Sequence, residues 1–326
     1  MNNKLSFFVI VGRGRSGTSM LSKILNSNSL FSIPGEFFFI VNLFDKYHKK
    51  KIKTKVIKNF VDDIFTEKRF QIKGFDRIKL EEYLIKKSPD NYRDLCLFTY
   101  ENLSSQKGKE NSRLLGDKNP HYAFFIPNII KIFNDVKFVY IVRDYRDNII
   151  SFKNVNFDMN NLYALAYRWN FFNKKIIKYQ KLYPDKFLSI KYENIILNSE
   201  SEIKRVCKFL NIDFEIDMLE FYKNKSNNLS EWHKNLNSNF NSENINKWEK
   251  VLTKKQTEKI DYICNNIAVK FGYKEKIKFN LKLFFTTIIY NIYSKAYTQS
   301  EMSLFIIPFS LRIKIINLFR KFQKTN

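Results

Sequence analysis

The stretch G-R-G-R-S-G-T-S, residues 12–19, follows the apolar run F-F-V-I-V at 7–11 and precedes apolar residues at positions 20, 21, 24 and 25. An apolar run that ends at a glycine predicts a buried strand, and the later spacing is that of one helical face. The first amides of a helix have no internal partner, and the helix dipole is positive at that end. The sequence therefore predicts a strand, an anion-binding turn and a helix.

Two common phosphate-binding loops match this stretch incompletely. The nucleotide triphosphatase pattern G-x-x-x-x-G-K-[ST] fits except that Thr18 occupies the lysine position, so that no side chain would reach β- and γ-phosphates. The glycines also satisfy the dinucleotide pattern G-x-G-x-x-G, with Glu36 at the distance of its ribose-binding acid. However, residues 26–35 make a poor second strand, and two arginines would crowd a loop that contacts pyrophosphate through its backbone.

A third interpretation places a cation inside the loop. Arg15 is followed by hydroxyls and amides that can bind one terminal anion, those of Ser16, Gly17, Thr18 and Ser19. R-S-G-T-S after a strand resembles the 5′-phosphosulfate loop of the sulfotransferases that use 3′-phosphoadenosine 5′-phosphosulfate. The resemblance implies that these five residues bind this co-substrate and that Arg15 also acts in catalysis. An ordinary strand-turn-helix without a site is the alternative.

The segment S-I-P-G-E-F-F-F, residues 32–39, places Glu36 among aromatic residues after a Pro-Gly turn. In sulfotransferases with an R-S-G-[ST] loop, including the tyrosylprotein type, a glutamate after a G-E turn is the catalytic base, and Glu36 resembles it. Apolar surroundings would raise the pKa of its carboxyl group, which suits a general base. A surface turn residue is the alternative.

A second polar turn, L-L-G-D-K-N-P-H-Y at residues 114–122, follows a short apolar run. It resembles the D/E-K-x-P turn of the same family, whose lysine contacts the transferring sulfuryl group, and this implies that role for Lys118. An exposed lysine at a strand end is the alternative. His121 is a rival base, but the histidine motif of the small-molecule branch is missing, so we expect a hydrogen-bonded turn residue.

The strand K-F-V-Y-I-V, residues 137–142, runs into R-D-Y-R-D-N-I-I-S-F-K at 143–153. This arrangement resembles the family's 3′-phosphate site, which implies that Arg143 and Ser151 bind that phosphate. The planar fork of an arginine suits a doubly charged oxyanion. The alternative is a helix-capping ion pair of Arg143 with Asp144 or Asp147.

Two softer motifs follow. K-Y-E-N-I at residues 191–195 resembles the family's Y-E-x-L, which implies that Tyr192 lies near the nucleotide. The polar stretch 223–248 is long enough to be a lid. Its end, N-I-N-K-W, resembles the end of the family's loop over the 3′-phosphate, which implies a cofactor contact for Lys247 although Asn246 replaces the serine of some relatives. The resemblance stops at residue 273.

Length and composition fit one large domain. The chain has 326 residues and a net charge of +25, which indicates an anionic ligand or surface, although many lysines also reflect a genome-wide bias. Three widely spaced cysteines without metal-ligand spacing indicate a reducing compartment. Because the loop begins at residue 12, we expect no signal peptide and a cytoplasmic protein, peripheral at most on the inner face of a membrane.

We predict an α/β protein with a P-loop-like three-layer α/β/α fold, a central parallel sheet of about four or five strands and a helical C-terminal tail. The sulfotransferase domain would span 1–273, with a helical insertion at 45–111 that shapes the acceptor cleft. Residues 274–326 form a basic, apolar tail without the roughly 18 uninterrupted apolar residues of a spanning helix, which suits an anionic leaflet or a partner.

The implied reaction moves a sulfuryl group from 3′-phosphoadenosine 5′-phosphosulfate to an acceptor hydroxyl. A glycan or lipid-linked glycan at the inner membrane face would suit the basic tail. No metal is expected, because no carboxylate cluster is evident. A nucleotide kinase or triphosphatase and a basic nucleic-acid-binding protein are the alternatives, although no nucleic acid is expected.

Overall fold

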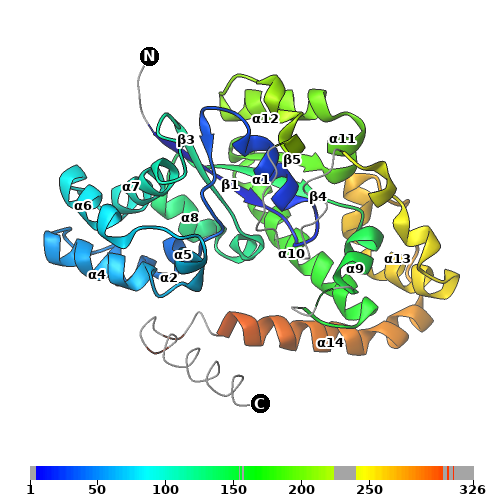
Figure 1. Ribbon diagram of the computed structural model, residues 1–326. Coiled ribbons are helices and arrows are strands. Elements are labelled where there is room, and N and C mark those ends of the chain that lie inside the picture. The colour runs from blue at the N-terminus through cyan, green and yellow to red at the C-terminus, as the bar shows by residue number, and fades with distance from the viewer. Residues whose placement is uncertain are drawn as a thin grey trace.

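A computed structural model describes residues 5–153, 155, 158–223, 240–303, 307 and 311. At its centre is a five-stranded sheet in the order β2-β3-β1-β4-β5, in which every pair of neighbours is parallel (Figure 1). The strands are β1 (Ser6–Val11), β2 (Phe31–Ser32), β3 (Leu114–Lys118), β4 (Lys137–Val142) and β5 (Phe187–Lys191). The predicted parallel α/β fold is confirmed. The stretch judged a poor second strand contributes only the two residues of β2.

Helices cover both faces of this sheet, which explains why its central strands are apolar throughout. On one face, Phe8 and Ile10 of β1 pack with α1 (Thr18–Asn26), α11 (Tyr192–Leu197) and α12 (Ser199–Leu210). On the other face, Phe7, Val9 and Val11 join a larger core. The helices of that core include α7 (Tyr92–Ser105), α8 (Ile126–Ile132), α10 (Leu162–Leu182) and α13 (Lys254–Ala268).

The segment 45–111 is helical, as the sequence pattern predicts. Its helices are α4 (Thr54–Ile64), α5 (Lys68–Ile72), α6 (Arg77–Lys87) and α7, preceded by the short α2 (Phe39–Asn42) and α3 (Phe44–Tyr47). They form a lobe beside the sheet in Figure 1. Phe60 and Phe70 of this lobe belong to the same core cluster as Phe7 of β1, so the lobe is packed onto the sheet.

Short elements complete the connections. They are α9 (Tyr145–Lys153) and the 3-10 turns η1 (Pro120–Phe124), η2 (Pro184–Lys186), η3 (Ile216–Met218), η4 (Phe221–Lys223), η6 (Ser242–Asn244), η7 (Lys247–Lys250) and η8 (Val269–Phe271). The cysteines Cys96, Cys207 and Cys264, in α7, α12 and α13, are buried and form no disulfide.

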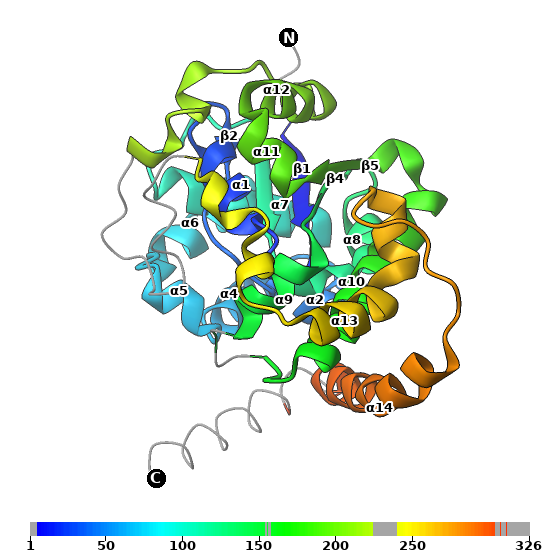
Figure 2. The same cartoon turned by 90° about the vertical axis from the view of Figure 1, so that its right-hand side faces the viewer.

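The described part of the tail contains one long helix, α14 (Leu281–Ser303), which runs along the outside of the molecule in Figures 1 and 2. Its small polar residues Thr287, Ser294 and Thr298 are buried. Tyr167 and Arg168 of α10 hydrogen-bond to Thr287 and Thr298, so this face packs on α10. Within the residues that the structure covers, no helix is both long and apolar enough to cross a membrane.

Candidate functional site

Every strand of the sheet delivers predicted site residues to the same edge. In the strand register Ile10 lies opposite Lys118, Val11 opposite Tyr140, and Val142 opposite Lys191, so the carboxyl ends of β1, β3, β4 and β5 are level. The glycine-rich loop follows β1, Glu36 follows β2, Lys118 ends β3, Arg143 follows β4 and Tyr192 follows β5. This edge is where parallel α/β sheets bind ligands.

The glycine-rich loop has a backbone that only glycine accommodates at its last turn. Gly17 is the N-cap of α1 with φ of 93°, and no side chain caps the first amides of that helix. A Cβ on Gly17 would lie 2.5 Å from Cδ2 of Tyr192. Arg15 also has a left-handed backbone, with φ of 65°, and the Ser16 amide donates to the Arg13 carbonyl at 3.2 Å. The loop thus presents uncapped helix amides beside a strained arginine.

The structure brings Arg15, Arg143 and Ser151 together. Arg15 Nε donates to Ser151 Oγ at 3.1 Å, and Arg143 Nη1 donates to the Arg15 carbonyl oxygen at 3.2 Å. Burial and the neighbouring Arg143 guanidinium lower the pKa of Arg15. Two like charges held at a helix N-terminus are an arrangement that an anion stabilises.

Arg143 has unused hydrogen-bonding capacity. Its buried Nε has no hydrogen-bond partner among the described residues, although a buried donor is normally satisfied. In the described structure Arg143 does not form the alternative ion pair with Asp144 or Asp147. Asp144 pairs with Arg146 at 2.6 Å, and Asp147 accepts from backbone amides.

The end of the predicted lid docks beside Arg143. Arg143 Nη2 donates to the Asn244 carbonyl at 2.6 Å, and the amides of Asn246 and Trp248 donate to Asp147 at 2.8 and 2.9 Å. Lys247 lies in this docked segment, but its side chain is exposed. The rest of the predicted lid, residues 224–239, lies outside the described residues.

Tyr192 forms one wall of the site. The Arg143 guanidinium lies 4.5 Å from the centre of its ring, and Gly17 packs against the same ring. This contact is possible because Tyr192 follows β5 directly while Arg143 follows the neighbouring β4. Arg143 Nε and the uncapped amides of α1 are donors that an anionic ligand could use, and the close packing of Gly17 on Tyr192 places them side by side.

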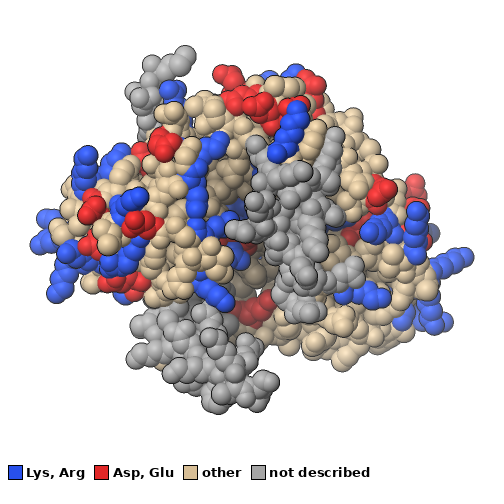
Figure 3. Space-filling view, viewed as in Figure 1, with Lys and Arg blue, Asp and Glu red and all other residues tan. Residues whose placement is uncertain are grey.

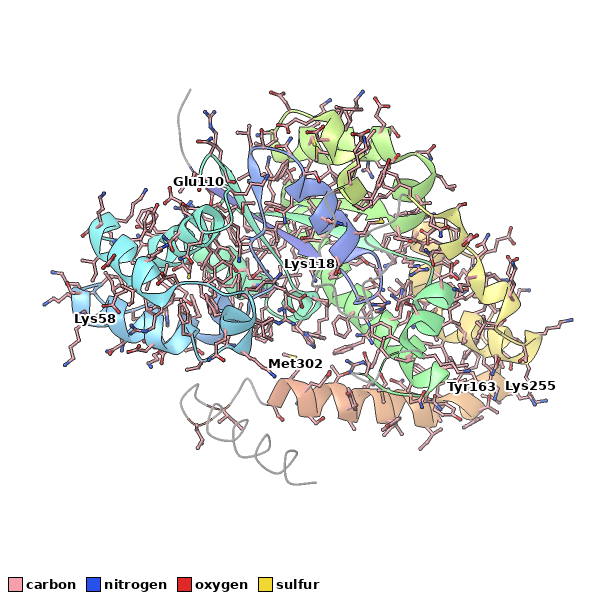
Figure 4. The ribbon with its side chains drawn as sticks, viewed as in Figure 1. Lys58, Glu110, Lys118, Tyr163, Lys255 and Met302 are labelled. Atoms are coloured by element: carbon pink, nitrogen blue, oxygen red, sulfur yellow. The ribbon has the colours of Figure 1, made fainter. Side chains whose placement is uncertain are left out.

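Glu36 and Lys118 form an ion pair next to the loop. Lys118 Nζ contacts Glu36 Oε2 and also donates to Ser19 Oγ at 3.2 Å, and Lys118 lies near the middle of the molecule in Figure 4. Arg69 of α5 binds the other side of Glu36, with Nη1 3.0 Å from Oε1 and 2.6 Å from the backbone oxygen. The Glu36 side chain is 26% exposed.

The expectation that the pKa of Glu36 is raised is wrong. Burial does act in that direction, but the charges of Lys118 and Arg69 outweigh it and lower the pKa of Glu36 to about 2. Nearby cations favour the carboxylate more strongly than desolvation disfavours it. Glu36 is therefore ionised at neutral pH and held by two cations.

Sequence reasoning missed a buried carboxyl group close to Glu36, that of Asp117. Asp117 is fully buried and accepts hydrogen bonds from the hydroxyl groups of Tyr100 and Tyr122 and from the Phe37 amide. Burial raises the pKa of Asp117 to about 7 despite these donors. Its place immediately before Lys118 in the D-K motif was a usable signal for a role near the site.

Two further contacts had no sequence signal. Arg69 is 33 residues from Glu36, inside a lysine-rich helical segment, and nothing in its local pattern marks it. Asn148 of α9 donates to the Gly14 carbonyl at 2.8 Å and to Ser16 Oγ at 3.0 Å, which fixes the loop.

The rival base His121 is a turn residue whose amide donates to Asn119, and burial lowers its pKa.

Comparison with known proteins agrees with this geometry. The model of the sulfotransferase family matches residues 8–216, which contain most of β1, the loop and the strands β2 to β5. The chain belongs to the sulfotransferase family, and the resemblance noted in the sequence is confirmed.

Two solved structures have a similar fold. The sulfotransferase domain from the curacin biosynthetic pathway is 20% identical, with a TM-score of 0.57, covering 83% of this chain and 98% of that domain. The sulfotransferase domain of the Synechococcus PCC 7002 olefin synthase is 17% identical, with a TM-score of 0.58, covering 84% of this chain and 98% of that domain. At these identities the likeness concerns the fold.

The matches to curated relatives cover only part of each relative. An uncharacterized protein of Aquifex aeolicus is 24% identical over 258 residues, which are 75% of this chain and 31% of that protein. A putative protein-tyrosine sulfotransferase of Caenorhabditis briggsae is 25% identical over 114 residues, 33% of this chain and 41% of that protein. The chain thus spans less than half the length of these relatives.

Proposed function

We propose that the protein transfers a sulfuryl group from 3′-phosphoadenosine 5′-phosphosulfate to an acceptor hydroxyl. The observation that carries this proposal is the placement of Arg143 against the backbone of Arg15. Two guanidinium groups from separate strand ends then face one ligand at the uncapped start of α1. Membership of the sulfotransferase family supports the same reaction.

In this proposal the two ends of the site bind two different anions. Arg15, the hydroxyls of Ser16, Thr18 and Ser19, and the amides around Gly17 hold the 5′-phosphosulfate end. Arg143 and Ser151 hold the 3′-phosphate end, with Tyr192 beside the nucleoside and Lys247 approaching from the lid. Arg15 links the two ends because it touches both Ser151 and Arg143.

Glu36 is the proposed general base. When bound, 3′-phosphoadenosine 5′-phosphosulfate would supply the sulfuryl group and the leaving 5′-phosphate. Lys118 Nζ contacts both Ser19 of the loop and Glu36, so its one ammonium group is shared between the loop and the carboxylate. An anion on the loop draws Lys118 away from Glu36, and the pKa of Glu36 rises toward the range of an effective base. Lys118 and Arg15 then stabilise negative charge on the departing oxygen.

The helical lobe is the proposed acceptor side. Arg69 of α5 reaches Glu36, so the 45–111 insertion borders the place where an acceptor hydroxyl must lie. Lys and Arg side chains gather over this lobe in Figure 3. Burial lowers the pKa of Lys73, and the cations Lys107, Lys118 and Arg69 lower it further, so the border is positively charged. A glycan or lipid-linked glycan that carries anionic groups would suit it.

The outer face of α14 is the proposed membrane contact, and its occupant is an anionic lipid surface at the inner face of a membrane. Leu281, Phe285, Ile289 and Ile292 are 60, 64, 61 and 59% exposed and share one helical face. Exposed Lys282 and Lys295 on the same helix add charge complementarity to anionic lipid.

Co-sedimentation with vesicles tests that contact. Ile289→Lys should abolish binding to phosphatidylglycerol vesicles, while phosphatidylcholine vesicles serve as the neutral control. Unchanged sedimentation of this variant, or equal binding to both vesicles, would remove the membrane proposal and leave the enzymatic one standing.

A calorimetric titration tests the reaction proposal. Adenosine 3′,5′-bisphosphate should bind without magnesium, and ATP and NAD should bind far more weakly. Arg15→Ala and Arg143→Ala should each abolish the bisphosphate signal, whereas Glu36→Gln should retain it and lose turnover. Tight magnesium-dependent ATP binding would favour the kinase or triphosphatase, and salt-sensitive binding of nucleic acid alone would favour the nucleic-acid binder.

A further inference from the structure

A buried chain of charges connects the glycine-rich loop to the C-terminal helix. Arg13, between the first two glycines of the loop, forms an ion pair with Asp158. Asp158 Oδ1 lies 3.0 Å from Arg168 Nε, and Arg168 Nη2 lies 2.8 Å from Glu301 Oε2 of α14. The side chains of Asp158 and Arg168 are 4% and 1% exposed. From the loop to α14, the charged side chains therefore follow one another in the order Arg13, Asp158, Arg168 and Glu301.

The inner end of this chain is held rigidly. The Arg13 guanidinium lies over the rings of Phe152 and Phe172, 4.1 and 4.6 Å from their centres. The backbone carbonyl of Arg13 accepts a hydrogen bond from the Ser16 amide, and this bond closes the turn of the loop. The residue whose side chain is held between the two rings is therefore part of that turn. Arg13 is thus an anchor for the backbone that carries Arg15.

The outer end of this chain contacts α14. Arg168 Nη1 donates to Thr298 Oγ1 at 2.9 Å, and its guanidinium lies 4.7 Å from the centre of the Tyr297 ring. Glu301 is one residue before Met302, which marks this end of α14 in Figure 4. With Glu301 in place, two arginines balance two carboxylates. Without it, Arg13 and Arg168 share the single carboxylate of Asp158, which leaves one buried positive charge without a counter-charge.

We propose that Glu301 of α14 is a positioning residue for the glycine-rich loop, acting through Arg168, Asp158 and Arg13. The match to the family model ends at residue 216, so Glu301 and the rest of α14 lie outside the matched region. Coupling between sites is reciprocal: if docking of α14 orders the loop, a ligand that orders the loop must stabilise the docking of α14 by the same factor.

Hydrogen exchange of the ligand-free protein tests the coupling directly. Glu301→Gln should speed exchange of the amides of residues 13–17 at least tenfold. Thr287→Val is the matched control, because it removes a contact of α14 with Tyr167 at 3.1 Å but leaves the charge chain intact. It should leave loop exchange within twofold of the wild type. Equal effects of both variants, or none from Glu301→Gln, would overturn the proposal.

Binding provides the second test, which rests on the proposed function. Glu301→Gln should weaken adenosine 3′,5′-bisphosphate binding at least tenfold, Glu301→Asp should recover part of the loss, and Thr287→Val should not change it. In the wild type, saturating bisphosphate should slow exchange in α14, a measurement that requires no variant to fold, and unchanged exchange there would contradict the coupling. If the wild type does not bind the bisphosphate, the proposed function fails while the ligand-free experiment still decides the coupling.

Discussion

Replacing Glu36 by glutamine should change how the stability of the protein depends on pH. The folded pKa of Glu36 is about 2 and its ordinary value is 4.5. A carboxyl group whose pKa is lowered on folding stabilises the folded state above its unfolded pKa, and this contribution disappears as the pH falls toward the folded pKa. The shift corresponds to about 3.4 kcal/mol at neutral pH, at about 1.4 kcal/mol for each pKa unit.

The effect is large enough to measure under mild acid. The wild type should lose about 1.4 kcal/mol relative to Glu36→Gln between pH 7 and pH 3.5, because Glu36 remains largely ionised in the folded state but not in the unfolded one. Urea unfolding of both proteins at pH 7, 5 and 3.5 gives this difference directly. Most of the change should lie below pH 5.

The opposite sign would refute the reasoning. If the apolar surroundings dominated and the pKa of Glu36 were raised, the wild type would gain stability relative to the variant as the pH fell. A difference that is independent of pH would mean that the charges of Lys118 and Arg69 only offset the effect of burial and do not outweigh it. Lys118→Met should reduce the acid dependence, since only Arg69 would then oppose the burial of Glu36.

Three other outcomes follow from the same geometry. Arg143→Lys keeps the charge but loses the planar guanidinium, so titration should show that adenosine 3′,5′-bisphosphate binds about 1.5–3 kcal/mol more weakly. Unchanged affinity would mean that the two-pronged hydrogen bonding of Arg143 does not contribute to binding. Gly17→Ala adds a collision with Tyr192 to a left-handed backbone, so urea unfolding should show a larger loss than for Gly108→Ala, which has a positive φ of 73° but open space; equal losses would contradict the collision. Asp117→Asn should become more stable relative to the wild type as the pH rises from about 4 to about 7, because Asp117 is still protonated in the folded state but already ionised in the unfolded state; a relative stability that does not change over this range would argue against the raised pKa.

The ion pair of Glu36 and Lys118 connects the two chemical tasks of the site. In the ligand-free protein, Lys118 keeps the proposed base ionised but too weakly basic for efficient proton removal. Because the same ammonium group reaches Ser19 of the loop, an anion bound at the loop would draw on the cation that lowers the pKa of Glu36. This would make the base effective only when the anion site is filled.

The sequence by itself determined the strand, turn and helix around residues 12–19. It also determined that the strand ends of the sheet carry Glu36, Lys118, Arg143 and Tyr192. Local patterns sufficed because an apolar strand of a parallel sheet delivers whatever follows it to one known edge. The chemical type of each residue then indicated an anion site, since arginines, glycines and hydroxyls bind oxyanions in few ways.

Only the tertiary structure decided the charge state of Glu36, the contribution of Arg69 and the docking of α14. Arg69 lies 33 residues from Glu36, and Arg13 lies 145 residues from Asp158. The pKa of a carboxyl group depends on the balance between burial and nearby charge, and both terms come from residues that no local pattern relates. The basic, apolar tail likewise has an inner face defined by Arg168 of α10, and a helix pattern cannot specify which distant arginine it will meet.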